Sequence, residues 1–312
     1  MNAPDNNLLA SVDARTKLAG SNRMEILLFS LGTSEIFGIN VFKVREVANT
    51  PAITKTPNMP PGVAGLISLR GKVIPVVSLA KVMGLNRDQQ DLGGTMMITE
   101  YSKRTLSFLV HGVDRIVRVD WDRVRAPDAL NSGNDEHFIT ALTELDSGRL
   151  VSILDVEQIM ANTFGEAVIG DIQRIEHGSS LEMFFVDDSL VARKKIMEIL
   201  DKLGVGHKHA VNGVEAWNRL AAMASHAEQN KVDLHDHLKL ILVDAEMPEM
   251  DGYVLTKKIK SDSRFANIPI IMHSSLSSEA NRAMGKAVGV DAYVAKFDGD
   301  ILAETIRPYL TQ

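Results

Sequence analysis

Polar residues in the last third of the chain have types and spacing suited to phosphoryl transfer. Each follows a short apolar run that is typical of a β-strand, and the residues are Asp187, Asp188, Asp244, Ser274 and Lys296. Open parallel sheets place functional groups at the carboxyl ends of their strands, so these side chains are expected to meet at one sheet edge. Three carboxylates, a hydroxyl and an ammonium group can together hold a divalent ion and accept a phosphoryl group.

The three carboxylates predict a bound cation. In one pocket, Asp187, Asp188 and Asp244 would repel one another and raise their own pKa values unless a positive charge neutralised them. Mg²⁺ suits such a pocket because it prefers oxygen ligands and keeps several waters that a phosphate can replace. As an alternative, Asp187 and Asp188 only cap the helix predicted from residue 190, for which Asp188 or Ser189 is a suitable cap.

The segment after Asp244 predicts a tight loop. Its sequence is Ala-Glu-Met-Pro-Glu-Met-Asp-Gly, in which Pro248 and Gly252 favour a turn ahead of a helix. Such a loop would expose the Asp244 carboxylate and turn the backbone carbonyl of Glu246 toward a bound ion. Further along, Tyr293 combines an apolar ring with a polar tip and could exchange between buried and exposed positions.

The elements that must position these residues alternate between strand and helix. Strands are predicted at 181–186, 210–211, 238–243, 268–272 and 292–294, and helices at 190–203, 214–222, 253–259, 278–288 and 301–310. Five strands alternating with five helices predict a flavodoxin-like (βα)5 α/β domain with a doubly wound sheet.

Residues 181–312 resemble response-regulator receiver domains. The resemblance rests on the acidic pair, the Asp244 motif Met-Pro-x-Met-Asp-Gly and the later hydroxyl and lysine, all in order. It implies that Asp244 is the phosphoacceptor. It also implies that Asp187, Asp188 and the backbone carbonyl of Glu246 bind Mg²⁺.

By the same resemblance, Ser274 and Tyr293 form a switch pair, and Lys296 clamps the phosphoryl group. A plain loop serine is the alternative for Ser274, because further serines follow it. The chain departs from the family at Phe297, where proline is usual, which leaves the geometry of that loop open. It also departs in a longer stretch at 225–237, whose histidines we expect to be solvated rather than metal-bound: His226, His235 and His237.

Residues 24–163 predict a β-rich domain. Short apolar or alternating runs recur at 24–31, 36–39, 63–69, 73–77, 95–100, 105–110, 115–119 and 149–154, with turn residues between them. Short helices fit at 41–47, 79–83 and 156–160. Many short strands without long helices favour small barrels over a doubly wound sheet.

This β-rich region resembles the CheW-type coupling domain of bacterial chemotaxis. The resemblance rests on residues 37–47 and on the run Leu-Arg-Gly-x-x-x-Pro-Val at 69–76. It implies two SH3-like five-stranded barrels that bind chemoreceptors and a histidine kinase and catalyse nothing. Arg70-Gly71 is predicted at a hairpin turn, where the guanidinium could pair with a partner's carboxylate or remain solvated. Glu46, at the end of a predicted short helix, could face a receptor or water.

Composition limits the classes of function that the chain can have. The chain has 312 residues, enough for two domains, a net charge of -6 without a Lys/Arg-rich run, and no cysteine. Nucleic acid binding and cysteine chemistry are therefore not expected. The start lacks a signal-peptide pattern, and no apolar run approaches the length of a membrane span, so we expect a cytoplasmic protein without membrane insertion. The predicted division is an arm at 1–23, a coupling domain at 24–163, a linker at 164–180 and a receiver at 181–312.

A CheW-like domain followed by a receiver is similar to the arrangement in the CheV adaptor family. This resemblance implies a cytoplasmic adaptor at chemoreceptor arrays that joins chemoreceptors to the kinase and is regulated by phosphorylation of Asp244. It is not expected to be an enzyme, apart from loss of its own phosphoryl group. Three alternatives remain: a phosphate sink, a scaffold with a silent receiver, and a receptor-modifying esterase. The esterase lacks support because no hydrolase motif is present.

Overall fold

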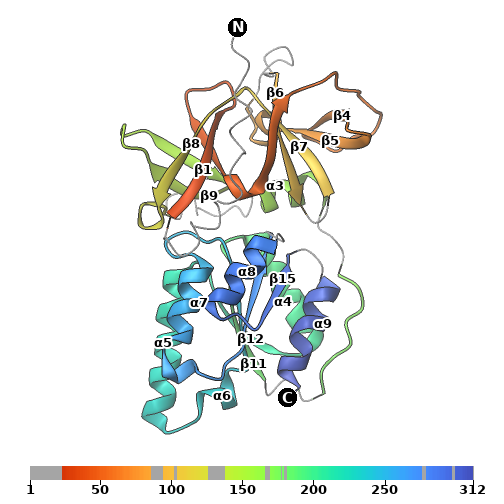
Figure 1. The fold of residues 1–312 in the computed structure, drawn as a ribbon. Helices are drawn as coiled ribbons and strands as arrows, with labels where there is room; N and C mark the ends of the chain where they lie inside the picture. The colour runs from red at the N-terminus through yellow and green to blue at the C-terminus, as the bar shows by residue number, and fades with distance from the viewer. Residues whose placement is uncertain are drawn as a thin grey trace.

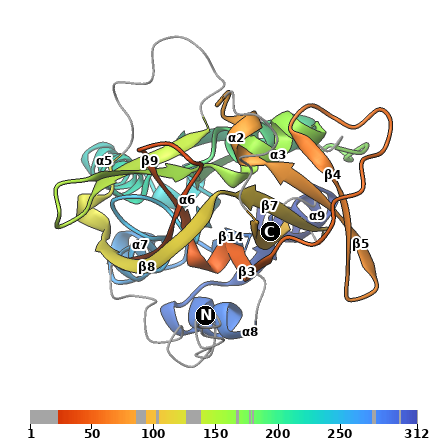
Figure 2. The ribbon, with the colours of Figure 1, turned by 90° about the horizontal axis from the view of Figure 1, so that it is seen from above.

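The computed structural model describes residues 23–85, 94–101, 104–125, 138–165, 169–176, 178, 181–275, 279–296 and 299–311. The predicted arm, apart from Arg23, and Phe297 lie outside the described residues, as does part of the predicted linker. The chain forms a β-rich part above an α/β part, with helix α3 of the upper part close to the lower one (Figure 1). Viewed from above, both sheets of the β-rich part lie over helices of the α/β part (Figure 2).

The first sheet of the β-rich part has the strand order β8-β1-β2-β10-β9. Its strands are β1 (Arg23–Ser30), β2 (Ile36–Asn40), β8 (Gly112–Asp120), β9 (Ile139–Glu144) and β10 (Leu150–Leu154). Alternate residues of β1 point to opposite faces, so Ile26 and Leu28 pack in one apolar cluster while Leu27 and Phe29 pack in another. Pairing is antiparallel except between β2 and β10, which are parallel.

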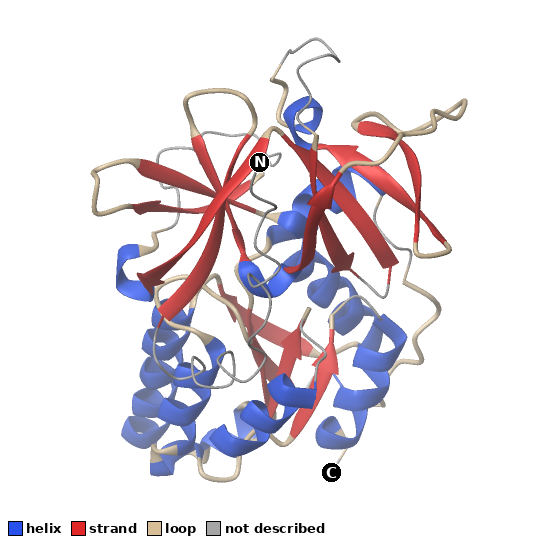
Figure 3. Ribbon diagram, turned by 45° about the horizontal axis from the view of Figure 1, so that its top comes forward, coloured by secondary structure: helices blue, strands red, loops and turns tan. Residues whose placement is uncertain are grey.

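The second sheet has the order β3-β6-β7-β5-β4 and comes from the chain between β2 and β8. Its strands are β3 (Val44–Asn49), β4 (Val63–Leu69), β5 (Lys72–Ser78), β6 (Thr95–Tyr101) and β7 (Arg104–Val110). The two sheets lie side by side (Figure 3). Two five-stranded sheets in an all-β domain confirm the predicted architecture of paired small barrels.

Short helices link and close these sheets, and one of them corrects the sequence-based prediction. They are η1 (Val41–Lys43), α2 (Leu79–Val82), η3 (Trp121–Arg123) and α3 (Val156–Phe164). The helix predicted at 41–47 ends after one turn, because Glu46, Val47 and Ala48 pair with strand β6. Glu46 therefore lies on a strand and not at a helix end. Strand β9 was not predicted.

The α/β part has a five-stranded parallel sheet in the order β12-β11-β13-β14-β15. The strands are β11 (Glu182–Val186), β12 (Gly206–Ala210), β13 (Leu240–Asp244), β14 (Ile270–Ser274) and β15 (Ala292–Ala295). This order is the flavodoxin-like one, as predicted. Strands β13 and β14 are fully buried, which explains the apolar runs that precede their polar last residues.

Helices cover both faces of this sheet. They are α4 (Leu190–Leu203), α5 (Gly213–Asn230), α7 (Gly252–Lys260), α8 (Glu279–Val288) and α9 (Gly299–Leu310), with the short α6 (Leu234–His237) and η6 (Ser263–Phe265). Residues of α4 and α9 share one apolar core, and residues of α5 and α7 share the opposite one.

The edge strand and the second helix of this domain differ from their predicted limits. Strand β12 begins at Gly206, where polar histidines at an exposed edge obscured the apolar pattern. Helix α5 runs on to Asn230, so His226 lies on a helix, while His235 and His237 lie on α6. No helix among the described residues is long and apolar enough to cross a membrane.

Candidate functional site

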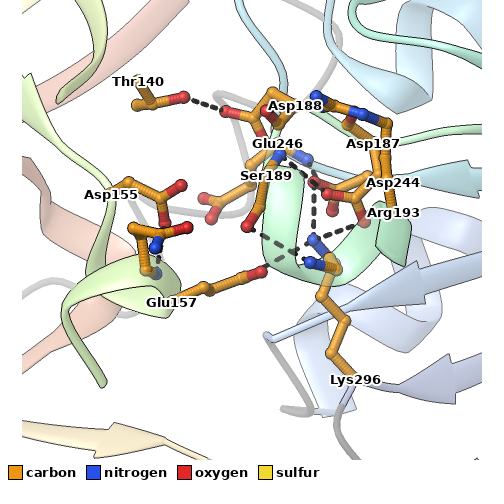
Figure 4. Close-up of polar contacts among 12 residues, drawn as sticks. Thr140, Asp155, Glu157, Asp187, Asp188, Ser189, Arg193, Asp244, Glu246 and Lys296 are labelled. Carbon is orange, nitrogen blue, oxygen red and sulfur yellow. Dashed lines mark hydrogen bonds and ion pairs between the residues drawn. The ribbon is translucent and has the colours of Figure 1, made fainter. Parts of the chain in front are cut away.

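The carboxyl edge of the parallel sheet brings the predicted acidic residues together. Asp187 and Asp188 follow β11 directly, and Asp244 is the last residue of β13, the neighbouring strand. Each of the three offers one carboxylate oxygen, and these oxygens lie within 4.8 Å of one another. Figure 4 shows the group with Lys296 pointing into it. The predicted cluster is therefore present as a compact set of oxygen donors.

Lys296 supplies the central positive charge of this cluster. Its Nζ lies 2.8 Å from Asp187 Oδ2 and 2.8 Å from Asp244 Oδ2. Burial opposes its charge, but the carboxylates of Asp187 and Asp244 outweigh that effect and raise the Lys296 pKa well above its ordinary value. Its backbone N–H donates to the carbonyl of Ser274 at 2.8 Å, which anchors the residue after β15 to the end of β14.

The carboxyl groups of Asp187 and Asp244 have raised pKa values, which indicates that the cluster lacks positive charge. Burial raises the pKa of Asp187 to about 7 despite the nearby Lys296. Burial likewise raises the pKa of Asp244 well above its ordinary value. One ammonium thus neutralises three carboxylates incompletely. Because the donors are clustered oxygens with surplus negative charge, the residues present fit Mg²⁺.

The turn after β11 shows that the acidic pair does not cap helix α4. Ser189 is the cap, because its Oγ accepts from the Ala192 N–H at 3.4 Å. Asp187 Oδ1 accepts from the Ser189 N–H at 3.0 Å. Arg193 Nη1 donates to the carbonyls of Asp187 and Asp188, both at 2.8 Å, and so fixes the turn from the helix side. Both acidic side chains keep oxygens directed toward the pocket (Figure 4).

The loop after Asp244 is as tight as its sequence predicts. Asp251 caps α7 by accepting from the Val254 N–H at 2.7 Å, and the Gly252 N–H donates to the Ala245 carbonyl at 3.0 Å. A Cβ atom at Gly252 would lie 2.0 Å from the Asp244 carbonyl oxygen, so only glycine fits there. The Glu246 N–H donates to Asp244 Oδ1 at 3.4 Å and orients the carboxylate. The ion-binding role of the Glu246 carbonyl stays a prediction.

The predicted switch residues lie beside the acidic cluster. Ser274 is fully buried at the end of β14, one residue after His273, which pairs with Asp244 on β13. Tyr293 is on β15, and burial raises the pKa of its hydroxyl to about 12, while a hydrogen bond with Ser274 acts in the opposite direction. Its ring lies under the Arg282 guanidinium, 5.4 Å from the ring centroid. The pair is thus placed in contact, with Tyr293 half-buried.

The predicted partner-binding residues lie in the second β-sheet, away from the acidic cluster. Arg70 Nη2 pairs with Glu46 Oε1 at 2.8 Å, and the arginine side chain remains 69% exposed. Arg70 and Gly71 form the β4–β5 turn with positive φ values of 49° and 77°. The pair connects Glu46 on strand β3 to the β4–β5 turn and leaves most of the arginine side chain exposed.

The sequence-based prediction missed four residues of the β-rich part that reach the acidic cluster. Glu157 Oε1 lies 3.4 Å from Lys296 Nζ, and both side chains are only 2% exposed. Asn40 Nδ2 donates to Glu246 Oε1 at 2.7 Å, and Thr140 Oγ1 donates to Asp188 Oδ2 at 2.9 Å. Lys43 is half-buried in the same place, and although desolvation opposes its charge, Glu157 and neighbouring carboxylates raise its pKa.

Two further carboxyl groups complete this cross-domain cluster. Asp155 caps α3 by accepting from the Gln158 N–H at 2.9 Å, and burial raises its pKa to about 6. Burial also raises the pKa of Glu246 to about 7, although Lys43 opposes the shift. The only sequence signal for this contact was a pair of acidic residues in the first turn of a helix. Acidic residues at this end of a helix ordinarily interact favourably with the helix dipole, so they did not predict a contact with the receiver.

Comparisons with known proteins agree with this architecture. The model of the CheW-like domain matches residues 25–164, and that of the response regulator receiver domain matches residues 183–307. Chemotaxis protein CheV3 of Helicobacter pylori is 35% identical over 279 residues, covering 88% of this chain and 88% of that protein. Chemotaxis protein CheV1 of the same organism is 27% identical over 324 residues, covering 97% and 98%. The scaffolding protein TtCheW from Thermoanaerobacter tengcongensis matches in structure with 26% identity and a TM-score of 0.41, covering 46% of this chain and 90% of that one.

Proposed function

Because the chain belongs to the CheV family of chemotaxis adaptors, we propose that it couples chemoreceptors to the chemotaxis histidine kinase under control of phosphorylation at Asp244. The observation that carries the regulatory part is the Lys296 ammonium held 2.8 Å from both Asp187 and Asp244 at the carboxyl edge of the sheet. This is the charge arrangement that phosphoryl transfer requires, since such transfer depends mainly on positioning and charge neutralisation.

In the proposed reaction, a carboxylate oxygen of Asp244 attacks the phosphorus of a phosphohistidine on the kinase. The new P–O bond forms as the P–N bond breaks, and the electron pair of that bond stays on the imidazole nitrogen. Lys296 leaves its carboxylate partners to pair with the phosphoryl oxygens. Asp187, Asp188 and the Glu246 carbonyl would hold Mg²⁺, which when bound supplies further positive charge to the transferred group.

We assign the switch to Ser274 and Tyr293. A phosphoryl oxygen on Asp244 would accept from the Ser274 hydroxyl, which draws β14 toward the site. Tyr293, already in contact with this hydroxyl, would then reposition the face formed by β15 and α8, on which its ring packs against Gly285. Such a change alters coupling only if the two states bind partners with different affinity.

The remaining assignments follow the family. The coupling domain spans 24–163 and the receiver 181–312, with an arm at 1–23 and a linker at 164–180. Glu46, Arg70 and Gly71 are assigned to partner contacts, because an exposed guanidinium at a rigid turn can pair with a carboxylate. The protein works at cytoplasmic chemoreceptor arrays by binding, and water attack on the acyl phosphate would return Asp244 to a carboxylate without any other turnover.

A reconstituted array of receptors, kinase and this protein tests the function. Asp244→Asn should take no phosphoryl group from the kinase, and the wild type alone should change kinase output as it becomes phosphorylated. Labelling of Asp244→Asn at the wild-type level would overturn the assignment of the phosphoacceptor. If phosphorylated and unphosphorylated protein bind the array equally, the protein acts instead as a sink that drains phosphoryl groups.

A further inference from the structure

The phosphoacceptor is covered by the chain's own coupling domain. Asp244 is 3% exposed and Lys296 is 5% exposed. The cover consists of the ends of β2 and β10, the adjoining η1 and α3, and strand β9, from which Asn40, Glu157 and Thr140 contact the receiver. Figure 4 shows Thr140 and Glu157 approaching the acidic cluster from the coupling domain. A receiver that accepts a phosphoryl group must present this same edge to its donor.

The cavity at the contact between the domains is too small for a phosphodonor. The cavity beside Asp188 and Glu246, lined on the other side by Asn40, Lys43 and Thr140, has a volume of about 20 Å³. That is room for about one water molecule. An imidazole ring carrying a phosphoryl group is several times larger, so it cannot approach Asp244 in this arrangement. The closed arrangement is therefore incompatible with phosphoryl transfer from a kinase.

Glu157 contacts the Lys296 ammonium, with which a phosphoryl group on Asp244 would also pair. Its Oε1 contacts Lys296 Nζ at 3.4 Å, on the ammonium that also holds Asp187 and Asp244. Its other oxygen, Oε2, is buried and has no hydrogen-bond partner among the described residues. A phosphoryl group on Asp244 would claim the same ammonium and add about one further negative charge beside this carboxylate. Two anions would then compete for Lys296 in a site closed to water.

We propose that Glu157 substitutes for the phosphoryl group at Lys296 in the unphosphorylated chain, so that domain closure and phosphorylation of Asp244 exclude each other. This inference rests on the proposed phosphorylation of Asp244 and adds its regulation. Phosphorylation separates the domains and exposes the η1 and α3 surfaces of the coupling domain. By reciprocity, a partner that binds the open coupling domain makes Asp244 easier to phosphorylate.

Hydrogen exchange of the full chain tests the opening. The chain is treated with acetyl phosphate and Mg²⁺, and mass spectrometry measures both phosphoryl content and amide exchange. Peptides covering residues 36–49 and 155–164 should exchange at least severalfold faster in the phosphorylated wild type, and Asp244→Asn should show no change. A fully phosphorylated chain with unchanged exchange in these peptides overturns the inference and leaves the proposed function intact.

Glu157→Gln tests the role of the charge, with Glu144→Gln at the exposed end of β9 as the matched control. The amide keeps the size of the side chain but removes the repulsion toward a phosphoryl group. Phosphorylated Glu157→Gln should therefore show a clearly smaller rise in exchange of α3 than the wild type, whereas Glu144→Gln should match the wild type. An equal rise in Glu157→Gln would show that Glu157 is a plain contact residue, contrary to the proposal.

A bulky substitution at the domain contact tests whether the closed arrangement keeps the phosphodonor away from Asp244. Thr140→Trp places an indole where only the small cavity is available, while Thr105→Trp on β7 is a control outside the cross-domain contacts. Thr140→Trp should be phosphorylated by the kinase about tenfold faster than the wild type, and Thr105→Trp at the wild-type rate. Equal rates in all three proteins overturn the inference. If none of them takes a phosphoryl group, the proposed function itself fails.

Discussion

At the scale of single residues, Lys296 determines how the acidic site can exist without a bound ion. Its ammonium is shared by Asp187, Asp244 and Glu157 in a place that is almost closed to water. Buried carboxylates that lose such a partner are strongly destabilising, because each keeps its desolvation cost without compensation. The residue therefore supports the fold as well as the proposed chemistry.

Replacement of Lys296 by methionine should show both effects. In the absence of Mg²⁺, Lys296→Met should lower the free energy of unfolding by about 3 kcal/mol, measured by urea titration near neutral pH. Lys208→Met, which breaks the exposed pair with Glu182, should cost less than about 1 kcal/mol. If the two variants are equally stable, the buried ion pairs contribute no more than a surface pair.

Asp155 gives a prediction about pH. Burial raises its pKa from 3.8 in the unfolded chain to about 6 in the folded one. A carboxyl group with a raised folded pKa binds a proton on folding between these values, so its contribution to stability is lost as the pH rises through this window. Asp155→Asn keeps the helix cap without the charge. From about pH 4 to about pH 7, the wild type should lose up to about 3 kcal/mol relative to this variant. Exposed Asp146→Asn is the control, and a pH-independent difference for Asp155→Asn would contradict the prediction.

At the scale of elements, the acidic site depends on the close approach of α7 to the end of β13. Gly252 is the point of contact, because a Cβ atom there would meet the Asp244 carbonyl oxygen at 2.0 Å. Gly252→Ala must push the helix away from the strand that carries Asp244. We expect a loss of about 2 kcal/mol or more in thermal or urea unfolding, together with slower phosphorylation. Gly112→Ala, where a Cβ meets no atom within 4 Å, should behave as the wild type.

The elements of the receiver could be predicted from sequence because its central strands begin with apolar runs and its helices have apolar stripes. The failures have local reasons. Residues 44–47 have apolar spacing that suits either a helix or a strand. They form a strand because Glu46 and Val47 pair with β6. In β12, His207 and His209 replace apolar residues at an edge, so no continuous run marked the strand. These outcomes depend on neighbours that local sequence does not contain.

At the scale of the whole molecule, the sequence predicted two domains but not their contact. The acidic cluster follows from residues at strand ends within one domain, which is why Asp187, Asp188, Asp244 and Lys296 were found together. Glu157 contacts Lys296 across the domain boundary, and Lys43 lies near carboxylates of both domains. In the sequence, both resemble ordinary polar residues of short helices. No periodicity or motif links positions as far apart as Glu157 and Lys296, which are separated by 139 residues.

The overall size of the molecule should respond to phosphorylation. A compact chain of this length has a radius of gyration of about 20 Å, and separation of two domains on a linker adds several ångströms. Small-angle X-ray scattering should therefore show a larger radius for the phosphorylated wild type than for the unphosphorylated protein. Asp244→Asn treated in the same way should keep the smaller value. An identical scattering curve for both forms of the wild type would mean that the domains stay together.

The parallel pairing of β2 with β10 has a mechanical consequence. Ile36 faces Val151 and Gly38 faces Ile153, so the two strands end side by side, although the whole second sheet lies between them in the sequence. One strand leads directly to Asn40 and Lys43, and the other to Asp155 and Glu157. These side chains are therefore attached to one pair of hydrogen-bonded strands, and we expect them to leave the receiver together. A ligand that bends either strand should then loosen all of their contacts with the receiver.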